Sequence, residues 1–231
     1  MDITFCIPYY GKEEANTELL TTCIGQIRKF YPDNPIIVCK TSDSFMPNSL
    51  EGPTTVYDTF ADGSHIFGAI ELLTRVCTTK HFLICHDSMF LLKPLPAKVL
   101  HQPLYPLWHF NEASIYFYDG LVQSLVPKSL PVKIEQKEYN GVFGPAFGGT
   151  LESLKTVWEL LAIRDIKPYM GRIGLMASER ILAIVFMYMG CATESLNGNI
   201  YKHPDVFKVT EIPDFSKITY DSYFFKIWKQ R

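Results

Sequence analysis

The segment Phe82-Leu83-Ile84-Cys85-His86-Asp87-Ser88 places three polar residues directly after four apolar ones. An unbroken apolar run of this length is typical of a strand buried on both faces of a parallel sheet. Two earlier segments, residues 2–8 and residues 36–39, are also apolar runs of this kind. The sequence therefore predicts three buried strands, the last of which ends at a polar cluster.

Between these strands, apolar residues recur at helical spacing. Residues 13–31 and 66–77 carry apolar side chains three and four positions apart, which predicts amphipathic helices. Strands that alternate with helices predict parallel pairing through right-handed crossovers. We therefore expect an α/β fold with a mostly parallel central sheet flanked by helices. Further helices are expected over about 151–163 and 175–189, and no linker interrupts the chain, which predicts a single domain over residues 1–231.

Composition limits the class of protein. Of the 231 residues, 47% are hydrophobic and 20% are charged, which is typical of a globular domain and excludes a disordered chain or a coiled coil. The net charge of −2 gives no overall attraction to nucleic acid, so no nucleic-acid partner is expected. The longest apolar run, residues 181–189, is shorter than the ~20 residues that cross a bilayer, so we expect no transmembrane segment. The N-terminus lacks the basic region of a secretory signal, and the six cysteines lack metal-binding spacing, so we predict reduced thiols and a cytoplasmic location.

Polar residues gather at the predicted carboxyl ends of all three strands. These clusters are Pro8-Tyr9-Tyr10-Gly11, Thr41-Ser42-Asp43 and His86-Asp87-Ser88. In open α/β sheets, ligands bind beyond the carboxyl ends of the strands. The shared position of the clusters therefore predicts a binding site at that edge of the sheet.

Asp87 and Glu179 are the first candidates for chemistry. A carboxylate after a buried strand can hold a divalent cation, which in turn holds a diphosphate, or it can cap the following turn. Glu179 lies near the predicted start of the helix over 175–189. There it would act as a general base, or it would only favour the helix dipole.

Other features also have a structural and a functional interpretation. Gly148-Gly149 lets the backbone approach a ligand closely, or it forms a simple turn. His65 precedes a helix, where backbone N–H groups meet a phosphate or make an ordinary N-cap. His203 is a metal ligand or a surface residue. The aromatic and basic tail over 223–231 is interpreted as an edge strand with a solvated basic face, the alternatives being contact with a phosphate or a membrane surface.

The order of these features resembles the GT-A fold of nucleotide-sugar glycosyltransferases over about residues 2–195. The first two strands and their polar ends look like that family's nucleotide-binding half, which would be about residues 1–95, followed by an acceptor half over about 96–231. Residues 82–94 resemble the strand that carries the family's D-x-D metal motif. In this chain the triplet is His86-Asp87-Ser88, so both outer acids are replaced.

The resemblance implies a role for each candidate. The nucleoside would be bound by Pro8, Tyr9, Tyr10, Ser42, Asp43 and His65. The donor sugar would lie near Ser88, Gly148 and Gly149, and Mn²⁺ or Mg²⁺ would be held by His86, Asp87 and His203. The catalytic residues would be Asp87, which holds the diphosphate through the metal, and Glu179, which resembles the acidic base of inverting members.

The expected function is therefore metal-assisted transfer of a sugar from a nucleoside-diphosphate-sugar donor to a glycan or other hydroxyl acceptor. Because the D-x-D triplet is degenerate, the alternative is a sugar-nucleotide-binding protein without transferase activity. A nucleotidyltransferase is the least favoured hypothesis. Gly11-Lys12 is a poor version of the glycine-rich basic loop that such an enzyme uses to grip a triphosphate.

Overall fold

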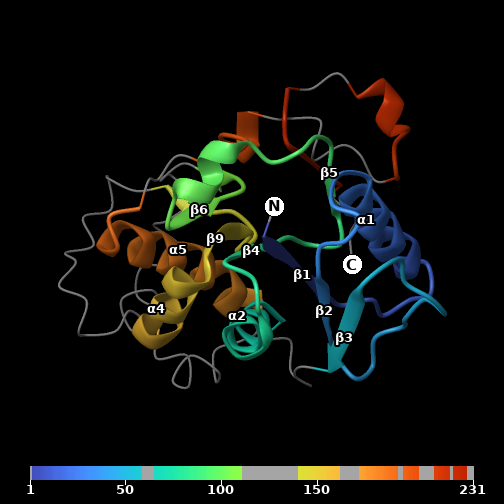
Figure 1. The fold of residues 1–231 in the computed structure, drawn as a ribbon, viewed down its shortest axis with the longest axis horizontal. Helices are drawn as coiled ribbons and strands as arrows, with labels where there is room; N and C mark the ends of the chain where they lie inside the picture. The colour runs from blue at the N-terminus through green and yellow to red at the C-terminus, as the bar shows by residue number, and fades with distance from the viewer. Residues whose placement is uncertain are drawn as a thin grey trace.

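The computed structural model describes residues 2–58, 65–110, 140–161, 172–191, 195–202, 211–218 and 221–227. A six-stranded sheet forms its centre (Figure 1). In spatial order the strands are β3 (Thr54–Asp58), β2 (Ile36–Lys40), β1 (Ile3–Tyr9), β4 (His81–Ile84), β9 (Phe147–Thr150) and β6 (Leu104–Pro106). The first four are parallel, and β9 is antiparallel to both of its neighbours. The predicted α/β fold with a mostly parallel sheet is confirmed.

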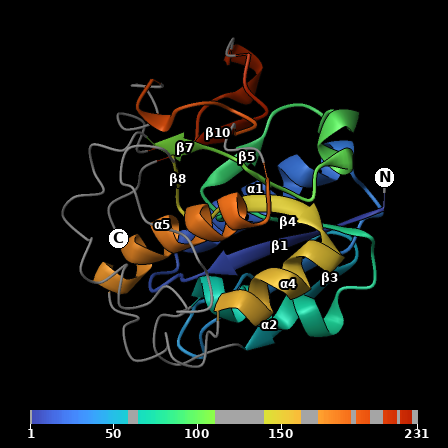
Figure 2. The same cartoon turned by 90° about the vertical axis from the view of Figure 1, so that its left-hand side faces the viewer.

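Helices cover both faces of this sheet. α1 (Asn16–Phe30) lies on one face, whereas α2 (His65–Val76) and α4 (Leu151–Leu161) lie side by side on the other (Figures 1 and 2). α5 (Arg172–Tyr188) packs against α4. The repeated apolar positions that predicted these helices are the ones that become buried, as α1 shows with Leu19, Leu20, Cys23, Ile24 and Ile27.

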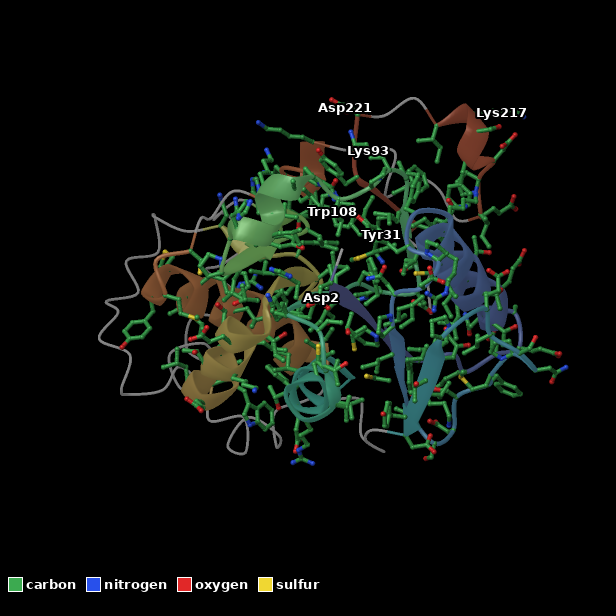
Figure 3. All side chains as sticks on the ribbon, in the orientation of Figure 1. Asp2, Tyr31, Lys93, Trp108, Lys217 and Asp221 are labelled. Carbon is green, nitrogen blue, oxygen red and sulfur yellow. The ribbon has the colours of Figure 1, made fainter. Side chains whose placement is uncertain are left out.

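Two short antiparallel ribbons lie outside the main sheet. β5 (Met89–Leu91) pairs with β10 (Phe224–Lys226), and β7 (His109–Phe110) pairs with β8 (Gly141–Val142). Figure 3 shows Lys93 beside Asp221, where the two side chains form an ion pair that joins the segments flanking β5 and β10. Short 3-10 helices span Ala97–His101, Ile200–Lys202 and Phe215–Lys217.

One cluster of buried apolar side chains connects the two halves of the chain. It includes Ile7 and Leu83 from the first half and Phe147 and Ile184 from the second, none of which exposes any surface. All six cysteines are free thiols, and all but Cys77 are buried. Within the described ranges, no helix combines the length and the apolar character that crossing a membrane requires.

The order of the strands reverses at the middle of the sheet. From β1 the chain moves outward to β2 and β3, and it then returns through α2 to place β4 on the other side of β1. Open α/β sheets bind ligands at such a reversal of strand order, beyond the carboxyl ends of the strands. The carboxyl ends of β1 and β4 therefore mark the edge at which a site is expected.

Candidate functional site

The loops after β1 and β2 meet at this edge of the sheet. The backbone N–H of Phe45 donates a hydrogen bond to the Gly11 carbonyl oxygen at 2.8 Å. The hydroxyls of Thr41 and Ser44 share a hydrogen bond of 2.8 Å, which closes the turn that follows β2. The two polar clusters predicted at these strand ends are therefore neighbours.

The residues of these two loops differ in how much surface they offer a ligand. Pro8 and Tyr9 are buried, and a Cβ on Gly11 would lie 2.0 Å from the Tyr9 hydroxyl oxygen, so glycine is needed where the Tyr9 ring packs. Burial gives Pro8 and Tyr9 a packing role and does not support their assignment to a nucleoside. Tyr10 is half-buried with the Lys12 ammonium 4.8 Å from its ring centre.

The turn after β2 exposes side chains at this end of the site. Ser42 and Asp43 are exposed, as a nucleoside contact requires. Phe45 is 51% exposed, so its ring is accessible to a ligand. Phe45 is not among the residues predicted from the sequence, although an aromatic residue directly after a polar turn was the available signal.

On the other side of β1, one residue, Gly144, joins Glu179 to His86. The Gly144 N–H donates to Glu179 Oε1 at 2.7 Å, and the Gly144 carbonyl oxygen accepts a hydrogen bond from His86 Nε2. Gly144 lies just before β9, and the antiparallel pairing of Phe147 with Ile84 brings that loop to the carboxyl end of β4. The backbone at Gly144 has a φ of +61°, a conformation that glycine adopts at little cost.

Glu179 lies about two turns into α5 (Arg172–Tyr188), so the expectation that it stands at a helix start is wrong. Its interaction with the helix dipole is therefore small, because that effect is confined to the first turn. Its side chain is 16% exposed, and burial raises the pKa of Glu179 to about 7, while the Gly144 N–H and Arg180 act to lower it. A carboxyl with a pKa near neutrality is suited to accepting and releasing a proton.

Arg180 is a buried cation next to this carboxyl. Its side chain is 2% exposed, and Nη1 lies 3.8 Å from Glu179 Oε2. The guanidinium also lies 5.0 Å from the centre of the Phe110 ring. Burial raises the pKa of Tyr201, Glu179 adds to the rise and Arg180 opposes it, which places Tyr201 in the same electrostatic group. Sequence patterning gave no sign of this arrangement, because Arg180 occupies a position that could equally face solvent.

Asp87 and Ser88, the other two members of the triplet His86-Asp87-Ser88, are buried. Together with Lys226 they form what is called the corner below. Asp87 is 1% exposed and Ser88 is 5% exposed. Lys226, which is 7% exposed, donates a hydrogen bond from Nζ to Ser88 Oγ. The interpretation of the C-terminal tail as a strand with a solvated basic face is therefore wrong at Lys226, because pairing with β5 buries this side chain.

The corner does not fit the Mn²⁺ or Mg²⁺ that the resemblance implies. His86 Nε2 donates to a carbonyl oxygen, so in the neutral ring only Nδ1 presents a lone pair to a metal. The Lys226 ammonium at Ser88 would repel a second cation. Within the ranges described, no group of three His, Cys, Asp or Glu side chains could hold a metal ion. His203 lies outside the described residues.

The remaining predicted positions lie elsewhere on the sheet. Gly148 and Gly149 are inside β9, where a Cβ would lie 2.4 Å from the Tyr105 hydroxyl oxygen and 2.1 Å from the Pro103 carbonyl oxygen, respectively. Close packing therefore explains both glycines, and the site is assembled without them. His65 begins α2, and its side chain is outside the described part of the structure.

Comparison with protein families and with curated sequences gives no match from which a function could be inferred. No protein-family model matches this chain, and no curated protein sequence matches it. The resemblance to GT-A glycosyltransferases therefore depends on the motifs and their order.

Proposed function

We propose that this protein is a GT-A-like glycosyltransferase that moves a sugar from a nucleoside-diphosphate donor to a hydroxyl acceptor. The observation that carries the proposal is Glu179, a carboxyl with a pKa of about 7 held at the carboxyl edge of β4. The fold supports it, because the polar groups gather where open α/β sheets bind ligands.

The donor would lie across the carboxyl ends of β2, β1 and β4. Its nucleoside would contact Tyr10, Asp43 and Phe45, because these side chains are at least partly exposed on two loops that touch. Aromatic faces suit the stacking of a nucleobase. The diphosphate would then extend toward His86-Asp87-Ser88 at the end of β4.

The proton in this reaction would pass from the acceptor hydroxyl to Glu179. As the acceptor oxygen bonds to the anomeric carbon, the bond from that carbon to the diphosphate breaks and its electron pair leaves on a phosphate oxygen. Glu179 Oε1 already accepts from the Gly144 N–H, so Oε2 would take the proton. Arg180, 3.8 Å from Oε2, favours the ionised carboxylate that is needed at the start.

A sugar-nucleotide-binding protein without transfer is the second candidate. It is favoured by the fact that Glu179 Oε1 and His86 Nε2 are both bonded to the same glycine. In that case the polar groups would hold the loop before β9 in place, and the carboxyl would have no proton to accept.

Thermal unfolding with a panel of nucleotides and nucleotide sugars tests both candidates. A ligand at 100 times its dissociation constant stabilises by about 2.7 kcal/mol, which shifts the midpoint by a few degrees. Any nucleotide sugar that shifts the midpoint is then assayed for transfer and for hydrolysis. The absence of any shift would overturn both candidates, and binding without transfer or hydrolysis across a broad set of acceptors would favour the second.

Glu179→Gln separates the base from a structural role. The variant should bind the donor as the original protein does, while transfer slows by about 10²–10⁴-fold, the usual contribution of a general base. Glu159→Gln, on the exposed face of α4, is the matched control and should be fully active. Unchanged transfer by the Glu179 variant would refute its assignment as base.

A further inference from the structure

Lys226 occupies the corner in which the resemblance places a metal. Its Nζ donates to Ser88 Oγ, and the backbone N–H of Ile227 donates to the Ser88 carbonyl oxygen at 2.9 Å. Lys226 belongs to β10 and lies 138 positions from Ser88 in the chain. Lys226 is therefore joined to the triplet through both its side chain and the neighbouring backbone.

The position of this lysine is fixed by strand pairing. In the antiparallel ribbon Lys226 stands opposite Met89, directly after the triplet. Phe224, two residues earlier, packs against buried Trp108 with ring centres 6.1 Å apart (Figure 3 labels Trp108). A slip of one residue would turn the lysine away from Ser88, so the packing of Phe224 also sets where the charge lies.

A buried ammonium needs a negative partner, and among the described residues Asp87 is the acid next to Ser88 in this corner. Burying an isolated charge is costly, and buried lysines are accordingly rare. The pKa of the Cys23 thiol is raised well above its ordinary value, first by a hydrogen bond to Cys85 and then by burial. Asp87 adds to this rise and Lys226 opposes it, so both charges lie near the same thiol.

The charge balance of this corner equals that of a loaded metal motif. Two carboxylates with a divalent cation sum to zero, and so do one carboxylate, Asp87, and one ammonium, Lys226, which both act on the Cys23 thiol. The two replaced acids and the added lysine are thus mutually consistent changes. A cation within the fold can neutralise a diphosphate as it leaves, which is the role that a bound metal would otherwise have.

We propose that Lys226 is a buried positive charge behind Ser88 that favours the diphosphate at His86-Asp87-Ser88, so that the donor binds without a divalent metal. This inference rests on the proposed function. It makes the C-terminal strand β10 part of the donor site, and it assigns Asp87 to holding the lysine in place of a metal.

Binding of UDP, GDP, ADP, CDP and inorganic pyrophosphate, each in Mn²⁺ and in EDTA, tests the inference by calorimetry. The protein should bind its preferred diphosphate with the same affinity in both conditions. Lys226→Gln should weaken that binding at least about tenfold, or about 1.4 kcal/mol, and Lys226→Arg should recover part of the loss. Lys217→Gln removes a charge from the surface, where the side chain is 82% exposed, and should bind normally (Figure 3).

The outcomes distinguish this inference from the proposed function. Binding that needs Mn²⁺ would overturn the role of Lys226 and leave the transferase proposal intact. Full binding in EDTA by a folded Lys226→Gln variant would also overturn the role of Lys226. If no nucleoside diphosphate or pyrophosphate binds the original protein, the proposed function fails and this inference fails with it. Should Lys226→Gln not fold, the comparison of Mn²⁺ with EDTA and the Lys226→Arg variant decide the question.

Discussion

Glu179 should make the stability of this protein depend on pH in a direction opposite to that of most carboxyl groups. Its pKa is raised from the ordinary value of 4.5 to about 7, so the folded protein binds this proton more tightly than the unfolded chain does. The resulting stabilisation is complete below pH 4.5 and is lost as the pH rises to about 7. At about 1.36 kcal/mol per pH unit, the change in the free energy of unfolding is about 3 kcal/mol. The side chain is only 16% exposed, so solvent screening reduces this value little.

Comparing the original protein with Glu179→Gln isolates this contribution. Glutamine retains an oxygen that accepts the Gly144 N–H but binds no proton in this range, and the titration of all other groups cancels in the difference. Urea unfolding of both proteins should show that the original loses about 3 kcal/mol relative to the variant between pH 4.5 and the range above pH 7. Glu159→Gln, at an exposed position of α4, is the control for the loss of a carboxyl group as such.

A stability difference that stays constant with pH would refute this reasoning. It would mean that Glu179 has the same proton affinity in the folded and unfolded states, so that burial leaves its charge unaffected. The assignment of Glu179 as a base near neutrality would then lose its physical support. A difference that grows in the opposite direction would place the pKa below 4.5, with Arg180 as the dominant neighbour.

Three further substitutions test the packing around the site. Gly149→Ala should destabilise the protein by about 3 kcal/mol in urea unfolding, because the new Cβ would lie 2.1 Å from the Pro103 carbonyl oxygen and backbone cannot move aside freely. Tyr31→Phe should cost about 1–3 kcal/mol in the same measurement, because the Tyr31 hydroxyl accepts a hydrogen bond of 2.8 Å from the buried N–H of Leu95. Gly144→Ala should cost about 1–2 kcal/mol through its φ of +61°, while leaving normal space for the methyl group. A variant as stable as the original protein would contradict the explanation given for that position.

The sheet and its helices were predictable because each leaves a periodic signal in the sequence. The apolar runs gave β1, β2 and β4, and the helical spacing gave α1 to within three residues at its start. The polar clusters at the strand ends were correctly expected at one edge of the sheet. These features depend on residues close together in the chain, which one sequence is able to reveal.

The detailed site could not be predicted, because its contacts join distant segments. The bond from Lys226 to Ser88 and the bond from Gly144 to Glu179 leave no local pattern. The sequence also does not reveal which side chains are buried. Tyr9 and Tyr10 are adjacent and identical in type, yet only Tyr9 is buried. Gly148 and Gly149 were assigned to a ligand because the neighbouring Tyr105 and Pro103 were unknown.

The ribbon of β5 and β10 has a consequence for the order of folding. β1, α1 and β2 associate through short loops, whereas the corner requires closure of a loop of 138 residues. Closing long loops costs entropy before any contact compensates for it, so such contacts form late. The central sheet should therefore become protected from hydrogen exchange before Lys226 reaches Ser88. During refolding, the diphosphate binding proposed for this corner should appear in a separate, slower phase than the secondary structure.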